Sequence, residues 1–340
     1  MAITLLIDVI KSAVIIVGVL TAFAYVTLLE RRLLARFQLR VGPNRVGPLG
    51  LLQPLADGIK LIFKEDFTPA GADLPIYLFA PLITVAAALF VYAVIPIGPP
   101  VTLFGREVTL YVADVNVGIL LVLGASSVGV YGIILGGWSS DNKYALLGGL
   151  RSTAQVISYE LTLGLAVLGV VLAANSLSLV DIVHAQSHRW FILSQPVAFA
   201  LFLVAGLAET NRAPFDLPEA EQELIAGYQT EYGGFKFAMF YLGEYVGIIT
   251  MGALTATLFL GGWQGLPLPP LPPAPAAVIQ VLWFLVKVCA VVFFFIWVRA
   301  TLPRVRYDQL MALGWKVLVP VGLANLALTA LLIVWAGGAV

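Results

Sequence analysis

Three glutamates lie in or beside segments that are otherwise apolar: Glu160, Glu209 and Glu244. A charge at the centre of a membrane-spanning helix costs about 2.5–3.5 kcal/mol on insertion scales, so such groups usually face a protein interior or water and serve ion or proton movement. A carboxyl group can both take up and release a proton. We interpret the three glutamates as candidates for a proton path. A second reading stays open for Glu160 and Glu209, which lie near segment ends and would reach water at the membrane surface.

An acidic stretch follows Glu209 at once, with the sequence NRAPFDLPEAEQELIAGYQTEY over residues 211–232. Its carboxylates are Asp216, Glu219, Glu221, Glu223 and Glu231, and apolar residues and Tyr228 are interleaved with them. One reading is a solvated acidic loop. The interleaved apolar residues favour the other reading, a loop covered by a partner protein, because a purely solvated loop does not need them.

Redox and metal chemistry have few ligands available in this sequence. Cys289 is the single cysteine, which excludes an internal disulfide, a CxxC pair and an iron–sulfur cluster held by this chain alone. His184 and His188 are four residues apart, but only Asp181 is near them, so we do not expect a metal site. The chain has no dinucleotide-binding turn, Walker loop or nucleophile elbow.

The elements that must position these groups are membrane helices. The chain is 60% hydrophobic and 11% charged, and a bilayer core needs roughly 20 apolar residues per helix. We therefore expect an all-α integral membrane protein, a single polytopic domain over 1–340 with about eight transmembrane helices. The predicted spans are 5–29, 74–97, 115–137, 154–174, 191–208, 237–260, 276–298 and 318–335.

Basic residues predict the orientation. Of the nineteen Lys and Arg, fifteen lie in the loops after spans one, three, five and seven, and two lie in the opposite loops. Cytoplasmic loops carry the excess of positive charge, so both termini are expected outside. Lys287 lies inside the seventh span, either as a counter-ion of Glu244 or as part of a second path.

Two cytoplasmic loops, 30–73 and 209–236, are longer than connectors need to be. In the first, VGPNRVGPLG breaks the helix repeatedly, either as a plain tight turn or as a shaped segment. After it, one helical face carries the apolar residues Leu52, Leu55, Ile59 and Ile62, and another carries the charged residues Asp57, Lys60 and Lys64. This pattern predicts an amphipathic helix lying in the membrane interface.

The chain resembles, end to end, the quinone-module membrane subunit of bacterial respiratory complex I, equivalent to mitochondrial NADH dehydrogenase subunit 1. The landmarks are Glu30-Arg31-Arg32, GPNRVGP running into LLQPLADGIKLIFKED, GWSSDNKYALLGGLRSTAQVISYE, AETNRAPFDLPEAEQELIAGYQTEY, FYLGEY and RATLPRVRYDQLMALGWK.

The resemblance implies a subunit of proton-translocating NADH:quinone oxidoreductase in the bacterial cytoplasmic membrane, with quinone as substrate. It implies a quinone-access chamber with a polar end formed by Arg36, Asp57, Asp216, Glu219, Glu221, Glu223, Tyr228, Glu231 and Arg299. It also implies a proton path through Glu160, Glu209 and Glu244. Some relatives have an acidic residue in the third span where this chain has Ser127.

The implied partners are the cluster-bearing subunits of the peripheral arm, the small and antiporter-like membrane subunits, and membrane lipid, with no nucleic acid. FMN and the iron–sulfur clusters would lie on partner subunits. Three alternatives remain: the related membrane subunit of an energy-converting hydrogenase, a stand-alone secondary transporter, and a passive anchor for the peripheral arm.

Overall fold

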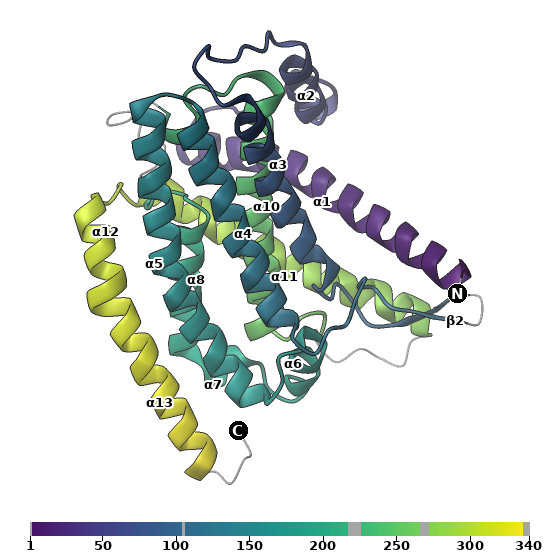
Figure 1. Ribbon diagram of the computed structural model, residues 1–340. Helices are drawn as coiled ribbons and strands as arrows, with labels where there is room; N and C mark the ends of the chain where they lie inside the picture. Colours follow the sequence, from purple (N-terminus) through teal and green to yellow (C-terminus); the bar gives the residue numbers. More distant parts are fainter. Residues whose placement is uncertain (1, 104–105, 217–225, 266–271, 336–340) are drawn as a thin grey trace.

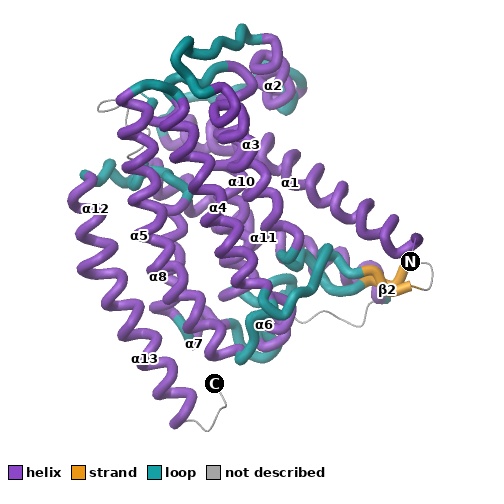
Figure 2. The backbone as a smooth tube through the Cα atoms, viewed as in Figure 1, coloured by secondary structure: helices purple, strands orange, loops and turns teal. Residues whose placement is uncertain are grey.

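The computed structural model describes residues 2–103, 106–216, 226–265 and 272–335, and these are mostly helical (Figures 1 and 2). The long helices are α1 (Ala2–Phe37), α3 (Leu74–Phe90), α4 (Gly118–Ser139), α5 (Lys143–Ala174), α8 (Pro196–Glu209), α10 (Gly234–Phe259), α11 (Pro273–Thr301) and α13 (Val319–Trp335). The short helices are α2 (Gln53–Phe63), α6 (Leu179–Ala185), α7 (Phe191–Ser194), α12 (Tyr307–Leu313), the 3-10 turns η1 (Pro48–Gly50), η2 (Val91–Ala93) and η3 (Gly227–Gln229), and the π-helical η4 (Gly314–Leu318). Strands β1 (Val101–Leu103) and β2 (Arg106–Val108) form one antiparallel pair.

Seven helical segments of the described chain are long and apolar enough to cross a membrane. They are Leu6–Phe37, Leu74–Ala93, Gly118–Ser139, Lys143–Ala174, Gly234–Phe259, Pro275–Thr301 and Tyr307–Trp335. They confirm the all-α membrane class. The fourth begins at Lys143, eleven residues before its predicted start, because Asn142 caps it by accepting a hydrogen bond from the Tyr144 amide at 2.8 Å.

The fifth predicted span is divided at Gln195 and Pro196 into α7 and α8. Proline has no amide hydrogen and disfavours helical backbone in the residue before it, so it ends α7 and starts α8. The 14 residues of α8 rise about 21 Å at 1.5 Å each, which is less than the membrane core of about 30 Å. The eight predicted spans therefore correspond, among the described residues, to seven long helices and to the shorter pair α7 and α8.

The helices pack closely where small residues meet. Figure 1 shows α4, α5 and α8 side by side, with α13 along the outer side of α5 and α1 slanting away from the bundle. α3 runs along α4, and a β-carbon placed on Gly132 would lie 2.1 Å from Thr84 Oγ1. Such close backbone approach is typical of helix pairs in membranes. α10 packs against α3 and α11, and most of its second half is buried.

The loops separate into two groups, as the charge pattern predicts. The loops after spans one, three, five and seven contact one another through Lys236 with Asp66 at 3.1 Å, Asn142 with Glu231 at 2.6 Å and Arg304 with Asp216 at 3.1 Å. The opposite segments contact one another through Ser178 with Asp114 at 2.9 Å and Gln264 with the Val183 carbonyl at 2.8 Å. Which group faces the cytoplasm stays a prediction.

The amphipathic helix predicted in the first loop is α2. Its apolar residues Leu55, Ile59 and Ile62 are exposed, as an interfacial face must be before it meets lipid. The turn before it is compact, because Gly50 has a positive φ and a β-carbon there would lie 2.5 Å from the Pro43 carbonyl oxygen. A glycine is required at that contact.

Candidate functional site

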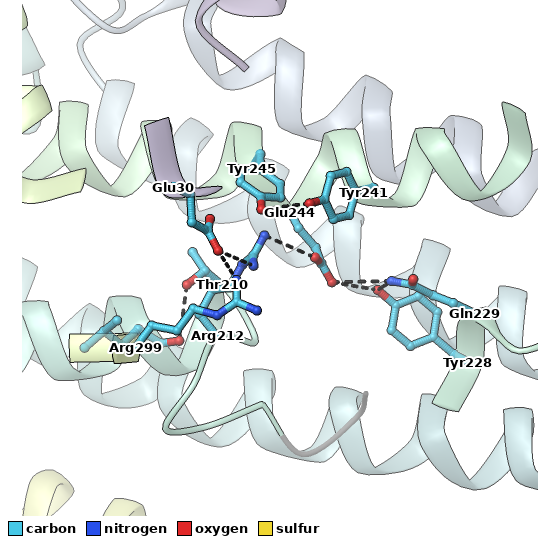
Figure 3. A network of polar contacts seen from close by, with 10 residues as sticks. Glu30, Thr210, Arg212, Tyr228, Gln229, Tyr241, Glu244, Tyr245 and Arg299 are labelled. Atoms are coloured by element: carbon cyan, nitrogen blue, oxygen red, sulfur yellow. Dashed lines mark hydrogen bonds and ion pairs between the residues drawn. The ribbon is translucent and has the colours of Figure 1, made fainter. Parts of the chain in front are cut away.

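The centre of the candidate site is Arg212, in the segment that follows α8 (Figure 3). Its guanidinium lies 3.6 Å from Glu30 of α1 and 3.7 Å from Glu244 of α10, measured from nitrogen to carboxylate oxygen. The exposed fractions of the three side chains are 9%, 4% and 8%. One buried cation therefore joins two buried carboxylates from helices that are distant in the sequence.

Two further groups complete the surroundings of Arg212. Arg299 of α11 donates a hydrogen bond to Glu30, so two cations share that carboxylate. The Arg212 guanidinium also lies over the Tyr245 ring, 4.1 Å from its centroid. Burial lowers the pKa of Arg212, but Tyr245, Glu244 and Glu30 together raise it above its ordinary value. Arg212 consequently holds its charge throughout the physiological pH range.

On its other side, Glu244 faces η3. Tyr228 Oη and Gln229 Nε2 each donate to Glu244 Oε1 at 3.4 Å, and Gln229 Nε2 lies 2.9 Å from Tyr228 Oη. Figure 3 shows Tyr228 and Gln229 on one side of Glu244 and Arg212 on the other. The two contacts at 3.4 Å are long for hydrogen bonds.

Glu244 and Glu209 line the same cavity. It has a volume of about 120 Å³ and lies between α3, α4, α5, α8 and α10. Asn211 and Ser126 add polar atoms to walls that are otherwise mainly apolar. Since a water molecule occupies about 30 Å³ of liquid, a cavity of this size holds roughly four waters. Glu209 Oε2 is buried and has no hydrogen-bond partner within the described chain, which is the kind of atom that a buried water satisfies.

Glu160 extends the series on the side of α4 and α5. Ser127 of α4 donates a hydrogen bond to Glu160, and the neighbouring Ser126 lines the same cavity as Glu209. The three sequence-predicted carboxylates therefore lie in one region: Glu160 interacts electrostatically with Glu209, and Glu209 and Glu244 line the same cavity.

Gln155 of α5 holds the segment that carries Arg212. Its side chain is fully buried, and its amide nitrogen lies 2.8 Å from the Ala208 carbonyl, 3.3 Å from Asn211 Oδ1 and 2.9 Å from the Phe215 carbonyl. One side chain thus fixes both ends of residues 208–215. Sequence reasoning did not identify this residue.

The residues predicted for the quinone chamber lie in several places. Tyr228 and Arg299 belong to the Arg212 cluster, and Asp216 pairs with Arg304 beside it. Asp57 pairs with Arg31 at 2.6 Å where α2 meets α1, and Arg36 is exposed near the end of α1.

Glu231 lies apart from these groups. Its carboxylate accepts from Asn142, and its carbonyl accepts from Tyr77 Oη at 2.7 Å. Glu219, Glu221 and Glu223 lie outside the described residues.

Other candidate groups have structural partners. His184 packs edge-on against Trp263, and the described residues contain no group of three or more His, Cys, Asp or Glu that could hold a metal. Lys287 contacts backbone carbonyls near the end of α10. Of the two alternatives for Lys287, the pairing with Glu244 is not among its contacts in the described part of the chain.

Sequence reasoning missed the central role of Glu30 and Arg212. Glu30 appeared only as a family landmark, and Arg212 only as a basic residue in a loop. A signal was present, because Glu30 directly follows a long apolar run and Arg212 follows Glu209 by three residues. Neither position reveals its partner, since the two are 182 residues apart.

Known proteins match this chain over nearly its whole length. The family model for NADH dehydrogenase matches residues 10–330. The second H-type subunit of the NADH-quinone oxidoreductase of Geobacter sulfurreducens is 57% identical over 94% of this chain and 94% of the relative. The corresponding second H-type subunit of Syntrophobacter fumaroxidans is 54% identical over 96% of both chains, and the H-type subunit of Thermomicrobium roseum is 57% identical over 93% of both. The described residues contain seven long apolar helices, and the chain is a multi-pass membrane protein of the NADH dehydrogenase family, similar over nearly its whole length to these NADH-quinone oxidoreductase subunits.

Proposed function

We propose that this chain is the H-type subunit of an NADH-quinone oxidoreductase, that it forms part of the quinone chamber, and that it passes protons between that chamber and the membrane arm. The single observation that carries the proposal is the buried cluster of Glu30, Arg212 and Glu244, which adjoins a cavity that Glu244 and Glu209 line together. The nearly full-length match to NADH-quinone oxidoreductase subunits supports the assignment to the complex.

The arrangement suits proton transfer for a physical reason. Buried carboxylates are costly unless they are paired. Here Glu209 has a buried oxygen with no hydrogen-bond partner within the described chain, and Glu244 lies 3.7 Å from Arg212 and 3.4 Å from Tyr228. A cavity with room for water lies between them. A proton on Glu244 can reach Glu209 through water in this cavity. Arg212 keeps its positive charge and therefore repels a proton from its own side of Glu244.

Quinone reduction supplies the driving step. Two-electron reduction of the quinone produces a base that must acquire two protons. The electrons would come from a partner subunit, because the single cysteine of this chain cannot hold an iron–sulfur cluster. A unit charge about 10 Å from a carboxylate changes its free energy by about 1.7 kcal/mol at an effective dielectric constant of about 20. Charge on the quinone thereby alters the proton occupancy of Glu30 and Glu244 without direct contact.

The polar end of the chamber lies at the same end of the molecule as α2. We assign Asp57, Arg36, Asp216 and the acidic segment to it, with Arg299 and Tyr228 linking it to the proton route. The cluster-bearing partner would cover this end, and the exposed apolar face of α2 would lie in the cytoplasmic leaflet. We assign the cytoplasmic side to the basic loops and the external side to both termini.

The test is proton translocation in sealed vesicles alongside quinone-linked turnover, after a native gel confirms assembly. Glu244→Gln and Glu209→Gln retain the shape of the side chain and remove its proton exchange. Both are expected to lower turnover and pumping together, because a coupled complex stalls when a proton step is blocked. Glu107→Gln, at an exposed glutamate of β2, is the matched control and should pump normally.

The chamber assignment has its own test. Glu221→Gln and Asp216→Asn are expected to lower quinone reduction while the oxidation of NADH by a hydrophilic artificial acceptor stays intact. Normal pumping and turnover in an assembled Glu244→Gln complex would falsify the proton route. Equal activity with both acceptors in the loop variants would contradict the chamber assignment.

A further inference from the structure

Lys287 has surroundings that the proton route does not use. It lies in α11, its side chain is buried, and its ammonium nitrogen is 2.5 Å from the Leu260 carbonyl oxygen and 2.9 Å from that of Gly262. A third hydrogen bond goes to the Gln264 carbonyl. An ammonium group has three donors, and here each one meets a backbone carbonyl.

An aromatic ring closes the same site. The Lys287 nitrogen lies 4.5 Å from the centroid of the Trp190 ring, within the range of a cation–π contact. Trp190 packs closely against the backbone of Gly261. A β-carbon at Gly261 would lie only 2.7 Å from Trp190 Nε1, and Gly261 has a positive φ, so this position requires glycine. The indole therefore packs directly on the glycine turn whose carbonyls bind the cation.

The site also closes the end of α10. The last carbonyls of a helix lack partners within the helix and carry partial negative charge. Leu260 follows the last residue of α10, and the Gly262 amide turns back to the Ala256 carbonyl at 2.7 Å. Lys287 supplies a full positive charge at this point from a neighbouring helix.

We infer that Leu260, Gly262, Gln264 and Trp190 form a binding site for a primary ammonium ion, and that Lys287 fills it as a tethered ligand rather than serving as a proton carrier or as the counter-ion of Glu244. Glu244 lies sixteen residues before Leu260 on α10, which is about 24 Å along the helix. The site adjoins α6 and α7, at the end of the bundle away from α2 (Figure 1). Lys287 in this site holds the C-terminal end of α10 in place.

Chemical rescue tests this inference directly. Lys287→Ala removes three methylenes and the ammonium group, so the missing part has the shape of propylammonium. The assembled complex in detergent is expected to have a lower unfolding midpoint than the natural complex. Propylammonium should raise that midpoint saturably by several degrees, because a ligand that binds only the folded state stabilises it. Ethylammonium should be weaker, and 1-propanol and tetramethylammonium, which lack the charge or the N–H donors, should have no effect.

Three controls distinguish the site from a general stabilising effect. Lys287→Met fills the space of the side chain and should lose stability without gaining any from propylammonium. Lys11→Ala, at a partly exposed lysine that pairs with Asp8 and donates to the Tyr111 carbonyl, should lose less stability than Lys287→Ala and gain none from propylammonium. Assembled Lys287→Met should retain the natural ratio of protons pumped to electrons transferred.

If Lys287→Ala does not assemble, cells are grown with and without propylammonium, and the amount of assembled complex is measured on native gels. We expect the assembled complex to recover only in cells grown with propylammonium. Rescue by 1-propanol equal to that by propylammonium, or no rescue in either experiment, would overturn the ammonium site. A reduced pumping ratio in assembled Lys287→Met would instead place Lys287 on a proton path. None of these results depends on the outcome for Glu244.

Discussion

Replacing Arg212 by Met should destabilise the protein strongly because it removes a cation that Glu30 and Glu244 share. At 3.6 Å and 3.7 Å from Glu30 and Glu244, each attraction is about 4–5 kcal/mol at an effective dielectric constant of about 20. Desolvation of the three groups offsets much of this gain. Removing one member of such a buried cluster typically costs about 3–5 kcal/mol, since an uncompensated charge is left behind. Glu30 still has Arg299, so most of the loss should come from Glu244.

A second substitution separates stability from proton transfer. In the Arg212→Met background, Glu244→Gln removes the stranded carboxylate and should recover about half of the lost stability, roughly 2 kcal/mol. It should not recover pumping, because the residue that exchanges the proton is gone. Arg212→Lys retains a charge but only a point charge without the planar fork, so we expect partial stability and partial turnover.

The assay is the thermal unfolding midpoint of the assembled complex, with turnover and pumping measured on the same preparations. Arg304→Met is the matched stability control, because its partner Asp216 is buried but Arg304 itself is 45% exposed, and such partly exposed pairs contribute about 1 kcal/mol or less. Arg212→Met and Arg304→Met with equal loss of stability would refute the reasoning. So would a double variant that is less stable than Arg212→Met alone.

Three further predictions follow from the packing and the topology. Ser127→Ala removes the hydroxyl that donates a hydrogen bond to Glu160 and should lower proton pumping in vesicles several-fold. Ser127→Thr retains the hydroxyl and should pump normally, so equal pumping by the two variants would exclude a role for this hydroxyl. Gly132→Ala should cost about 1–3 kcal/mol, seen as a lower unfolding midpoint, because its new methyl group meets Thr84; an unchanged midpoint would show that α3 and α4 can separate freely. Single cysteines at the exposed positions Asn44 and His188 should react with impermeant thiol reagents only from the cytoplasmic and the external side respectively, and the reverse pattern would overturn the orientation.

Much of the fold was predictable because hydropathy is a local property. Each long helix contains a predicted apolar run, although α5 begins well before its run, and α2 follows directly from the spacing of Leu55, Ile59 and Ile62. The exception is the fifth span, where apolar composition concealed the break at Pro196. Composition averages over a window, whereas one missing amide hydrogen acts at a single position.

The candidate site was predictable only in part. An intramembrane carboxylate is recognisable from its surroundings in the sequence, which is why Glu160, Glu209 and Glu244 were identified, and the resemblance in sequence placed them on a common path. Asp57 was placed on the polar face of α2, but its partner Arg31 was not predicted. The segment around Asp216 was recognised by its acidity, whereas the amide of Gln155 that holds it in place carries no such signal.

The amino-acid sequence by itself determined that this chain is a membrane protein, where its helices lie, and which family it belongs to, because these depend on the composition and order of neighbouring residues. Only the tertiary structure decided the partners of the buried charges. Arg212 meets Glu30 and Glu244 because α1, α10 and the end of α8 converge, and Lys287 meets backbone carbonyls rather than a carboxylate because the end of α10 turns beneath α11. Electrostatic energy depends on distance through space, and that distance is set by helix packing rather than by separation along the chain.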